Sequence, residues 1–210
     1  MMGCVRLLPR GFRPLLLAHH VTEPLFNTYE YGGYLMWRLW PQERVFIDGR
    51  ALSESIFMDY ARILYNHDAS GGKSADELLD QFGVQAIVMN SFEYANGLVY
   101  LLAPALADPA QTDWKLVYSD AQAMVFMRHP PPGVPPLDSL RVLDHMEAEC
   151  DLHVEHEPQY PRCARGLGQV FERIGDLTRA RRWIGVYLAH PHDPDLEAEQ
   201  EYQRLVGLRR

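Results

Sequence analysis

A small set of polar side chains is predicted to gather at one edge of a sheet. Strands are expected at residues 24–28 and 44–48, on either side of a helix that starts near Gly32 and Gly33. Ligands of open parallel sheets lie beyond the carboxyl ends of the strands. The polar residues at those ends are Asn27, Tyr29, Glu30, Tyr31, Asp48 and Arg50. They could hold a polar peptide, a sugar or an anion; alternatively, Asp48 and Arg50 only tie a loop to their own domain.

Other chemical signatures receive little support from the sequence. His67 stands where a phosphate-binding loop ending in Gly72-Lys73-Ser74 would need its first glycine. The histidines do not combine with cysteines or carboxylates at the spacing of a metal site. No Gly-x-Ser-x-Gly element marks a nucleophilic serine. We therefore expect no cofactor, no metal and no catalytic residue, and doubt that the chain is an enzyme on its own.

The composition excludes two classes of function. The net charge of -8 and the pI near 5.5 argue against a nucleic-acid-binding protein, because phosphate contacts need clustered Lys and Arg. No apolar run approaches the ~20 residues that a membrane-spanning helix needs. Residues 1–22 are expected to form a poorly structured leader, or the stub of something longer.

The elements that position the polar edge predict an α/β domain over residues 23–128. Ser74 begins a capping box for a helix at 75–82, and Gly83 is a suitable helix stop. A hairpin is expected to close the domain. The expected order is β-α-β-α-α-β-α-β-β, a small, mostly parallel, Rossmann-like sheet with an antiparallel edge hairpin. Beyond the strands and helices already named, the expected elements are a helix after Ser53, a strand at 85–90, a helix at 97–106 and hairpin strands at 114–118 and 123–128.

The last third of the chain is predicted to be helical. Residues 129–136 contain five prolines and are expected to form a stiff linker. Helices are expected at 137–150, 162–175, 177–189 and 196–208. Residues 164–191 resemble one tetratricopeptide repeat, through Ala164, Leu167, Gly168, Phe171, Gly175, Ala180, Ile184 and Pro191. Residues 137–210 are accordingly either a protein-docking surface or a helical cap that stabilises the chain.

Three cysteines leave the redox state open. Cys4 lies in the leader, whereas Cys150 and Cys163 flank an acidic segment. The latter two could form one disulfide, which would require an oxidising compartment. The alternative is two separate thiols.

The stretch 26–50 resembles a block in bacterial polytopic membrane proteins of the GT-C glycosyltransferase class. The matching residues run Phe26-Asn27, Tyr31-Gly32-Gly33-Tyr34-Leu35, Trp37, Pro41 and Val45-Phe46-Ile47-Asp48-Gly49-Arg50. Residues 83–88 and 114–128 are similar to later parts of the same domain. In those proteins this domain is extracytoplasmic and follows a bundle of transmembrane helices, and a tetratricopeptide tail also occurs.

The resemblance implies a function shared with a membrane enzyme. A looser similarity links Tyr29-Glu30-Tyr31-Gly32 with the Trp-Trp-Asp-Tyr-Gly block of oligosaccharyltransferases, which helps recognise the acceptor peptide. The catalytic acids of that class lie between membrane helices that this sequence lacks. The resemblance thus implies a non-catalytic, periplasmic domain that presents an acceptor or partner to an active site elsewhere. A tetratricopeptide-type interaction module, with the α/β half as scaffold, is the alternative.

Overall fold

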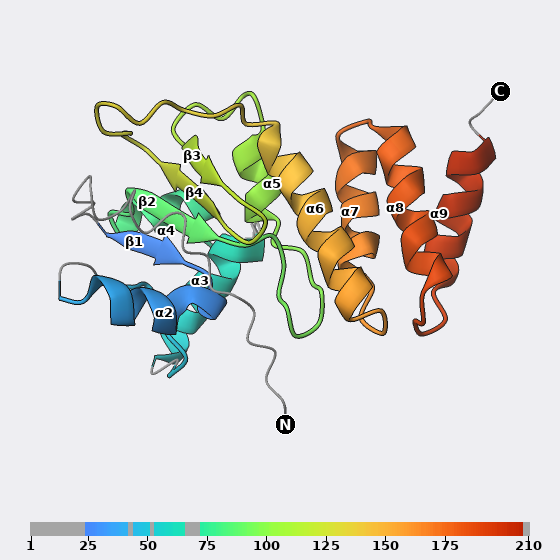
Figure 1. Ribbon diagram of the computed structural model, residues 1–210, viewed down its shortest axis with the longest axis horizontal. Coiled ribbons are helices and arrows are strands. Elements are labelled where there is room, and N and C mark those ends of the chain that lie inside the picture. Colours follow the sequence, from blue (N-terminus) through green and yellow to red (C-terminus); the bar gives the residue numbers. More distant parts are fainter. Residues whose placement is uncertain (1–23, 42–43, 51–52, 66–71, 208–210) are drawn as a thin grey trace. The chain divides into compact units, whose positions relative to one another are not determined.

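The computed structural model describes residues 24–41, 44–50, 53–65 and 72–207, which fold into a mixed α/β structure (Figure 1). The chain divides into two compact units. One contains the residues up to Asn90 together with Leu101–His145, and the other contains Ser91–Tyr100 together with Met146–Arg210. The segment Ser91–Tyr100, which we had placed in the α/β half, thus belongs to the helical unit.

The sheet of the first unit is mixed rather than mostly parallel. It has the order β1 (Leu25–Asn27), β2 (Ala86–Met89), β4 (Met124–Met127) and β3 (Lys115–Ser119). β1 and β2 are parallel, whereas β2 pairs with β4 and β4 with β3 in antiparallel fashion. The predicted closing hairpin is therefore confirmed, but the Rossmann-like pattern of parallel strands is not found.

The strand expected at residues 44–48 is reduced to one bridge. Val45 pairs in parallel with Leu25, at the edge of β1, and the pairing ends there. The apolar run Val45-Phe46-Ile47 looked like a buried strand because apolar runs of this length are typical of parallel sheets. The side chain of Asn27 makes the backbone hydrogen bonds to residues 46 and 47 that a neighbouring strand would otherwise make.

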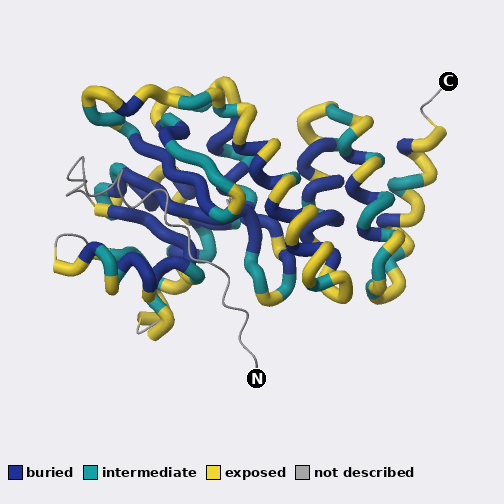
Figure 2. The backbone as a smooth tube through the Cα atoms, viewed as in Figure 1, coloured by how far each residue is buried: buried dark blue, intermediate teal, exposed yellow. Residues whose placement is uncertain are grey.

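Both faces of the sheet are covered. Alternate strand residues point to α2 (Tyr29–Leu39), and the cluster on that side contains Leu25, Tyr31, Tyr34, Leu35, Leu39, Ala86, Val88, Val117, Ala123, Val125, Met127 and Val134. On the opposite face, the ring of Phe26 lies 5.7 Å from that of Tyr60 in α3 (Glu54–Tyr65). β1, β2 and β4 are accordingly buried throughout, whereas β3 is partly buried at Lys115, Tyr118 and Ser119 (Figure 2). Since Val134 joins this core, part of the proline-rich segment packs on the first unit.

The helix signals around α4 (Ala75–Gln81) are confirmed. Ser74 Oγ accepts a hydrogen bond from the backbone N–H of Glu77 at 3.2 Å, and Glu77 Oε2 accepts one from the backbone N–H of Ser74 at 2.8 Å. This is the predicted capping box. Gly83, at φ +65°, follows the helix end, where a left-handed conformation favours glycine.

The helix expected at residues 97–106 begins later. α5 spans Leu102–Ala107. Gly97 has φ +73°, and a bridge between Phe92 and Val99 holds the preceding residues as a loop. A left-handed residue cannot open an α-helix, so the helical spacing of residues 97–101 was misleading.

Four helices follow: α6 (Arg141–His156), α7 (Arg162–Arg173), α8 (Leu177–Ala189) and α9 (Leu196–Gly207). α7 and α8 approach closely at Gly168, where a Cβ atom would lie 2.4 Å from Ile184 Cγ1. Gly175, at φ +84°, supplies the turn between them. Of the helices in the described ranges, none is both long enough and apolar enough to cross a bilayer.

A buried carboxylate fixes Ser91–Tyr100 within the helical unit. Glu149 of α6 is only 4% exposed. Its Oε2 accepts a hydrogen bond from the backbone N–H of Ser91, and its Oε1 accepts one from the Tyr94 hydroxyl, both at 2.8 Å. The ring of Phe92 meets the ring of His153 edge-on at 5.1 Å. The loop is thus a structural part of the helical unit, although Glu149 lies 58 positions from Ser91 in sequence.

Cys150 of α6 and Cys163 of α7 are joined by a disulfide. Both residues are completely buried. Gly97 lies against this bridge, since a Cβ atom on it would be 3.0 Å from the backbone nitrogen of Cys163. The disulfide therefore pins the two helices beneath the Ser91–Tyr100 loop.

Breaking this disulfide should destabilise the helical unit. For a loop closed over a sequence separation of 13, the loss of chain constraint predicts a decrease of about 3 kcal/mol in unfolding free energy. Urea unfolding with and without reductant measures this effect. The double variant Cys150→Ala/Cys163→Ala should show no reductant effect; equal stability of the oxidised and reduced wild type would contradict the prediction.

Candidate functional site

The side chain of Asn27, at the end of β1, forms hydrogen bonds with the backbone of its own domain. This side chain is fully buried. Its Oδ1 accepts a hydrogen bond from the backbone N–H of Phe46 at 2.9 Å, and its Nδ2 donates to the carbonyl oxygen of Ile47 at 2.9 Å. Nδ2 also donates to the carbonyl of Thr28. The amide therefore replaces the sheet ladder that residues 46–47 would otherwise make, and it has no remaining donor for a ligand.

Gly32 of α2 allows the helix to lie directly on the same segment. A Cβ atom at this position would be 2.2 Å from the carbonyl oxygen of Ile47 and 2.7 Å from Cα of Asp48. Gly33, by contrast, has open space where its Cβ atom would be. Of the two neighbouring glycines, only Gly32 is required by packing.

Tyr29 connects the start of α2 to two other segments. Its hydroxyl donates to the carbonyl oxygen of Gly49 at 3.0 Å, and its backbone N–H donates to the Tyr60 hydroxyl at 2.8 Å. The Tyr29 side chain is 42% exposed. Tyr60 and Gly49 were not among the predicted site residues. No local signal in the sequence indicates the Tyr60 contact, which spans 31 residues.

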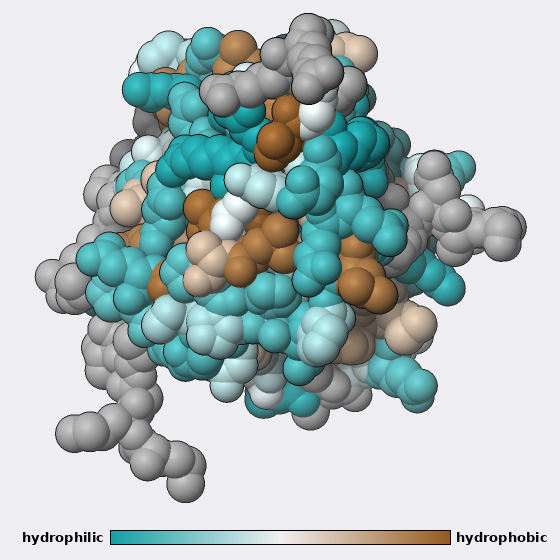
Figure 3. All heavy atoms as spheres, turned by 90° about the vertical axis from the view of Figure 1, so that its right-hand side faces the viewer, coloured by the Kyte–Doolittle hydropathy of each residue, from teal (hydrophilic) through white to brown (hydrophobic). Residues whose placement is uncertain are grey.

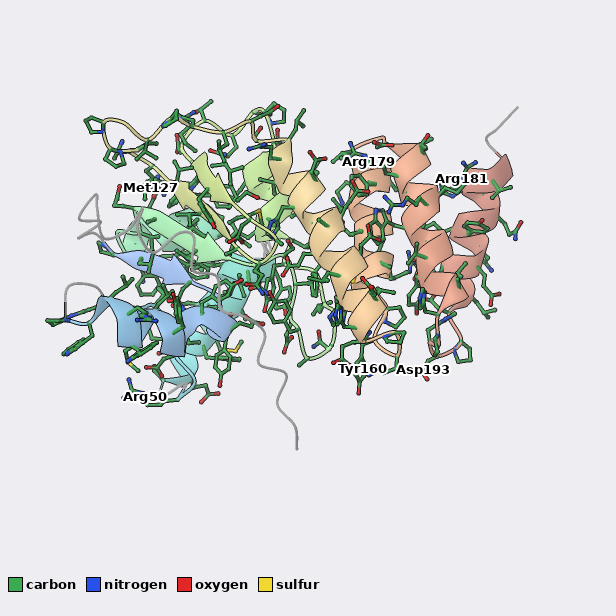
Figure 4. All side chains as sticks on the ribbon, in the orientation of Figure 1. Arg50, Met127, Tyr160, Arg179, Arg181 and Asp193 are labelled. Carbon is green, nitrogen blue, oxygen red and sulfur yellow. A yellow bond between two sulfur atoms is a disulfide. The ribbon has the colours of Figure 1, made fainter. Side chains whose placement is uncertain are left out.

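Asp48 and Arg50 form a local ion pair in the turn that follows. Nε of Arg50 lies 3.0 Å from both carboxylate oxygens of Asp48, whose Oδ1 also accepts the backbone N–H of Arg50 at 2.9 Å. The hydrogen bonds and charge of Arg50 lower the pKa of the Asp48 carboxyl. The side chain of Arg50, which is labelled in Figure 4, is exposed. Its exposed fraction is 61%, against 12% for the side chain of Asp48.

Tyr31 and Glu30 lie apart from that turn. The Tyr31 hydroxyl donates to the carbonyl oxygen of Gln122, in the turn between β3 and β4. Tyr31 itself is 2% exposed and belongs to the core. Glu30 is half-buried in the first turn of α2, where a carboxylate stabilises the positive end of the helix dipole.

The six predicted residues therefore do not form one site. Asn27 and Tyr31 are buried and bonded to backbone, whereas Tyr29 and Arg50 border an exposed turn at residues 48–50. Asp48 is already neutralised by Arg50, so this turn can offer guanidinium N–H groups and a tyrosine ring to a polar ligand. No group of three His, Cys, Asp or Glu side chains suited to a metal ion occurs within the described ranges.

Comparison with known proteins yields one structural likeness. No family model matches the chain, and no curated protein matches it. The chain is similar to a crystal structure of the C-terminal globular domain of an oligosaccharyltransferase from Archaeoglobus fulgidus. The superposition covers 58% of this chain and 99% of that domain, with 9% sequence identity and a TM-score of 0.41.

Gly32→Ala should destabilise the protein, whereas Gly33→Ala should not. The added methyl at position 32 collides with the backbone of Ile47 and Asp48, so we expect a loss of about 1–3 kcal/mol in unfolding free energy. At position 33 the methyl meets nothing, and the higher helix propensity of alanine should be neutral or add up to about 1 kcal/mol. Chemical unfolding of both variants measures the difference in unfolding free energy. Equal effects of the two substitutions would refute the close approach of α2 to residues 47–48.

Proposed function

We propose that this chain is a non-catalytic, extracytoplasmic domain related to membrane glycosyltransferases, and that it presents an acceptor or a partner to an active site located elsewhere. The observation that carries the proposal is how the stretch 26–50 folds. Asn27 binds the backbone of residues 46–47, and Gly32 lets α2 pack on residues 47–48. The turn at residues 48–50 remains on the surface. The stretch that resembles those enzymes is thus a preformed surface. We call its polar edge, formed by Tyr29 and the turn at residues 48–50, the rim.

The chemistry of the rim favours binding over catalysis. A general acid or base needs a pKa near the working pH. The hydrogen bonds from Arg50 instead lower the pKa of Asp48, because the carboxylate accepts from three groups of Arg50, namely its backbone N–H, its Nε–H and its Nη2–H. Arg50 keeps an exposed guanidinium that can recognise a carboxylate or phosphate on an acceptor.

The later residues of the resemblance also pack together. Arg128 places its guanidinium 4.5 Å from the ring centre of Trp114, and its Nε donates to the carbonyl of Val84 at 3.2 Å. Its backbone N–H donates to the carbonyl of Gln85 at 3.0 Å. These contacts connect the residues before β2 to the β3–β4 hairpin. They support the interpretation that the resemblance reflects a shared domain architecture.

The buried disulfide supports an extracytoplasmic location. Structural disulfides persist in oxidising compartments and are rare in reducing ones. Cys150 and Cys163 are both inaccessible to solvent, so their bond serves structure rather than redox exchange. The disulfide therefore supports the proposed location on the periplasmic face of the membrane.

A second candidate function is protein docking by the helical unit, with a tetratricopeptide-like pair in α7 and α8. α7 and α9 border an open groove of about 560 Å³, lined by Gln169, Glu172, Arg173, Glu197, Gln200, Glu201 and Arg204. Figure 3 faces the end of the molecule that carries α9, and its surface is largely hydrophilic with apolar residues near the middle. A groove of alternating charge suits a polar peptide segment.

Site-specific photo-crosslinking separates the two functions. A photoreactive phenylalanine analogue replaces either Tyr29, at the rim, or Gln200, in the groove, and the protein is irradiated in its own cells. The main proposal predicts that position 29 forms an adduct with a polytopic membrane glycosyltransferase. Adducts from position 200 alone would favour the helical groove, and sugar transfer by the purified chain without membranes would contradict a non-catalytic role.

Arg50→Ala should lower the yield of the position-29 adduct by about ten-fold, which corresponds to about 1.4 kcal/mol of binding. Its melting temperature should barely change, because exposed ion pairs contribute about 0–1 kcal/mol. Arg62→Ala is the matched control, since Arg62 forms a comparable exposed pair with Asp59 in α3. A large drop in melting temperature for Arg50→Ala would assign Asp48 and Arg50 a structural role only.

A further inference from the structure

Two large aromatic side chains project from the C-terminal end of α2. Trp37 is 70% exposed and Trp40 is 67% exposed. The other two tryptophans, Trp114 and Trp183, are almost completely buried. Tryptophan on a protein surface at this exposure is uncommon, and a pair three residues apart is a local feature of the surface.

The helix holds this pair firmly outward. Tyr34, Leu35 and Leu39 bury the opposite side of α2 in the core of the first unit. The close approach at Gly32 fixes the same helix against residues 47–48. The two indoles cannot therefore turn inward without dismantling the core, so their exposure belongs to the folded state.

One arginine contacts an exposed indole, and two more lie in the same stretch of the chain. The guanidinium of Arg38 lies 3.8 Å from the ring centre of Trp37, in a cation–π contact. Nη2 of Arg50 lies 3.8 Å from Met36 Sδ, on the preceding residue of the helix. Arg44 is exposed. The stretch 36–50 carries these three arginines against Glu43 and Asp48, a local charge of +1 in a chain of net charge -8.

We propose that this surface, defined by Trp37, Arg38, Trp40 and Arg44, docks on an anionic phospholipid bilayer. The indole is apolar with one N–H, and tryptophan is enriched where hydrocarbon meets headgroups. Arginine beside it reaches the headgroup phosphates while its stem stays among apolar groups. The inference does not rest on the proposed function, because the exposure and charge of these residues carry it alone.

A sugar or a protein partner fits these residues less well. Sugar recognition combines an aromatic face with hydrogen-bond acceptors, but the carboxylate of Asp48, in the turn whose Arg50 contacts Met36 of this helix, is bound by Arg50. One face of the Trp37 ring already carries the Arg38 guanidinium. Aromatic rings in a stretch whose local charge is +1 match the chemistry of an anionic bilayer surface instead.

Vesicle binding tests the inference directly. The full chain is mixed with vesicles of 70% phosphatidylcholine and 30% phosphatidylglycerol, and with vesicles of phosphatidylcholine alone. We expect co-flotation with the anionic vesicles, weaker binding to the neutral ones, and a blue shift of tryptophan emission. Since Trp114 and Trp183 are already buried, that shift reports Trp37 and Trp40.

Two variants and a matched control complete the test. Trp37→Ser/Trp40→Ser should weaken binding to the anionic vesicles by about ten-fold or more, the equivalent of about 1.4 kcal/mol. Arg44→Glu should weaken the same binding and leave binding to neutral vesicles unchanged. Tyr160→Ser, which removes an aromatic residue of the helical unit that is 48% exposed (Figure 4), should bind as wild type.

Either of two outcomes overturns the inference. One is that the wild-type chain does not bind anionic vesicles, and the other is that the double tryptophan variant binds them equally well. If the double variant does not fold, Arg44→Glu decides alone, because Arg44 is an exposed residue outside the helix and the core. Unchanged anionic binding by Arg44→Glu would then refute the bilayer as the occupant.

Discussion

The α/β unit depends on one buried amide, the side chain of Asn27. It satisfies a donor and an acceptor of the segment at residues 46–47, which lies beside the sheet without joining it. A buried backbone group without a partner costs about 1–3 kcal/mol, so two groups left open would be a large fraction of the stability of a domain this size. The amide matches this need, since it has both a donor and an acceptor at its tip.

The consequences of this interaction extend to the surface. With residues 46–47 held by Asn27, the backbone of Ile47 and Asp48 becomes the floor on which α2 rests at Gly32. The chain then turns outward, where Asp48 and Arg50 pair and Tyr29 reaches the carbonyl of Gly49. The rim is thus positioned by a buried polar contact rather than by an extended strand, which is why it stays ordered on so short a sheet edge.

Local signals in the sequence predicted those elements whose cause is local. The Ser74–Glu77 capping box, the stop at Gly83 and the bounds of α8 depend on neighbouring residues, and all three agree with the structure. The prediction of a strand at residues 44–48 was wrong because the side chain of Asn27, twenty positions from Ile47, supplies hydrogen bonds that a neighbouring strand would otherwise supply. The grouping of residues 91–100 with the helical unit likewise depends on a distant contact, since Glu149 accepts a hydrogen bond from Ser91 across 58 positions.

The candidate site shows the same limit. Asn27 and Tyr31 have the residue types of ligand-binding groups, and sequence alone cannot tell whether such groups face solvent or backbone. In the structure their polar atoms bond to Phe46, Ile47 and Gln122.

Several residues of the stretch that resembles membrane glycosyltransferases build the domain itself. Asn27, Tyr31, Gly32 and Arg128 each contact backbone within the first unit. Such residues constrain the fold and say little about what it binds, because their polar groups are occupied. The recognition chemistry of this protein should lie in the side chains that the fold leaves exposed beside them. Trp37, Trp40 and Arg50 meet that condition. The two tryptophans are exposed at the end of α2, and Arg50 is exposed in the turn that contacts this helix at Met36. None of the three belongs to the core of the first unit.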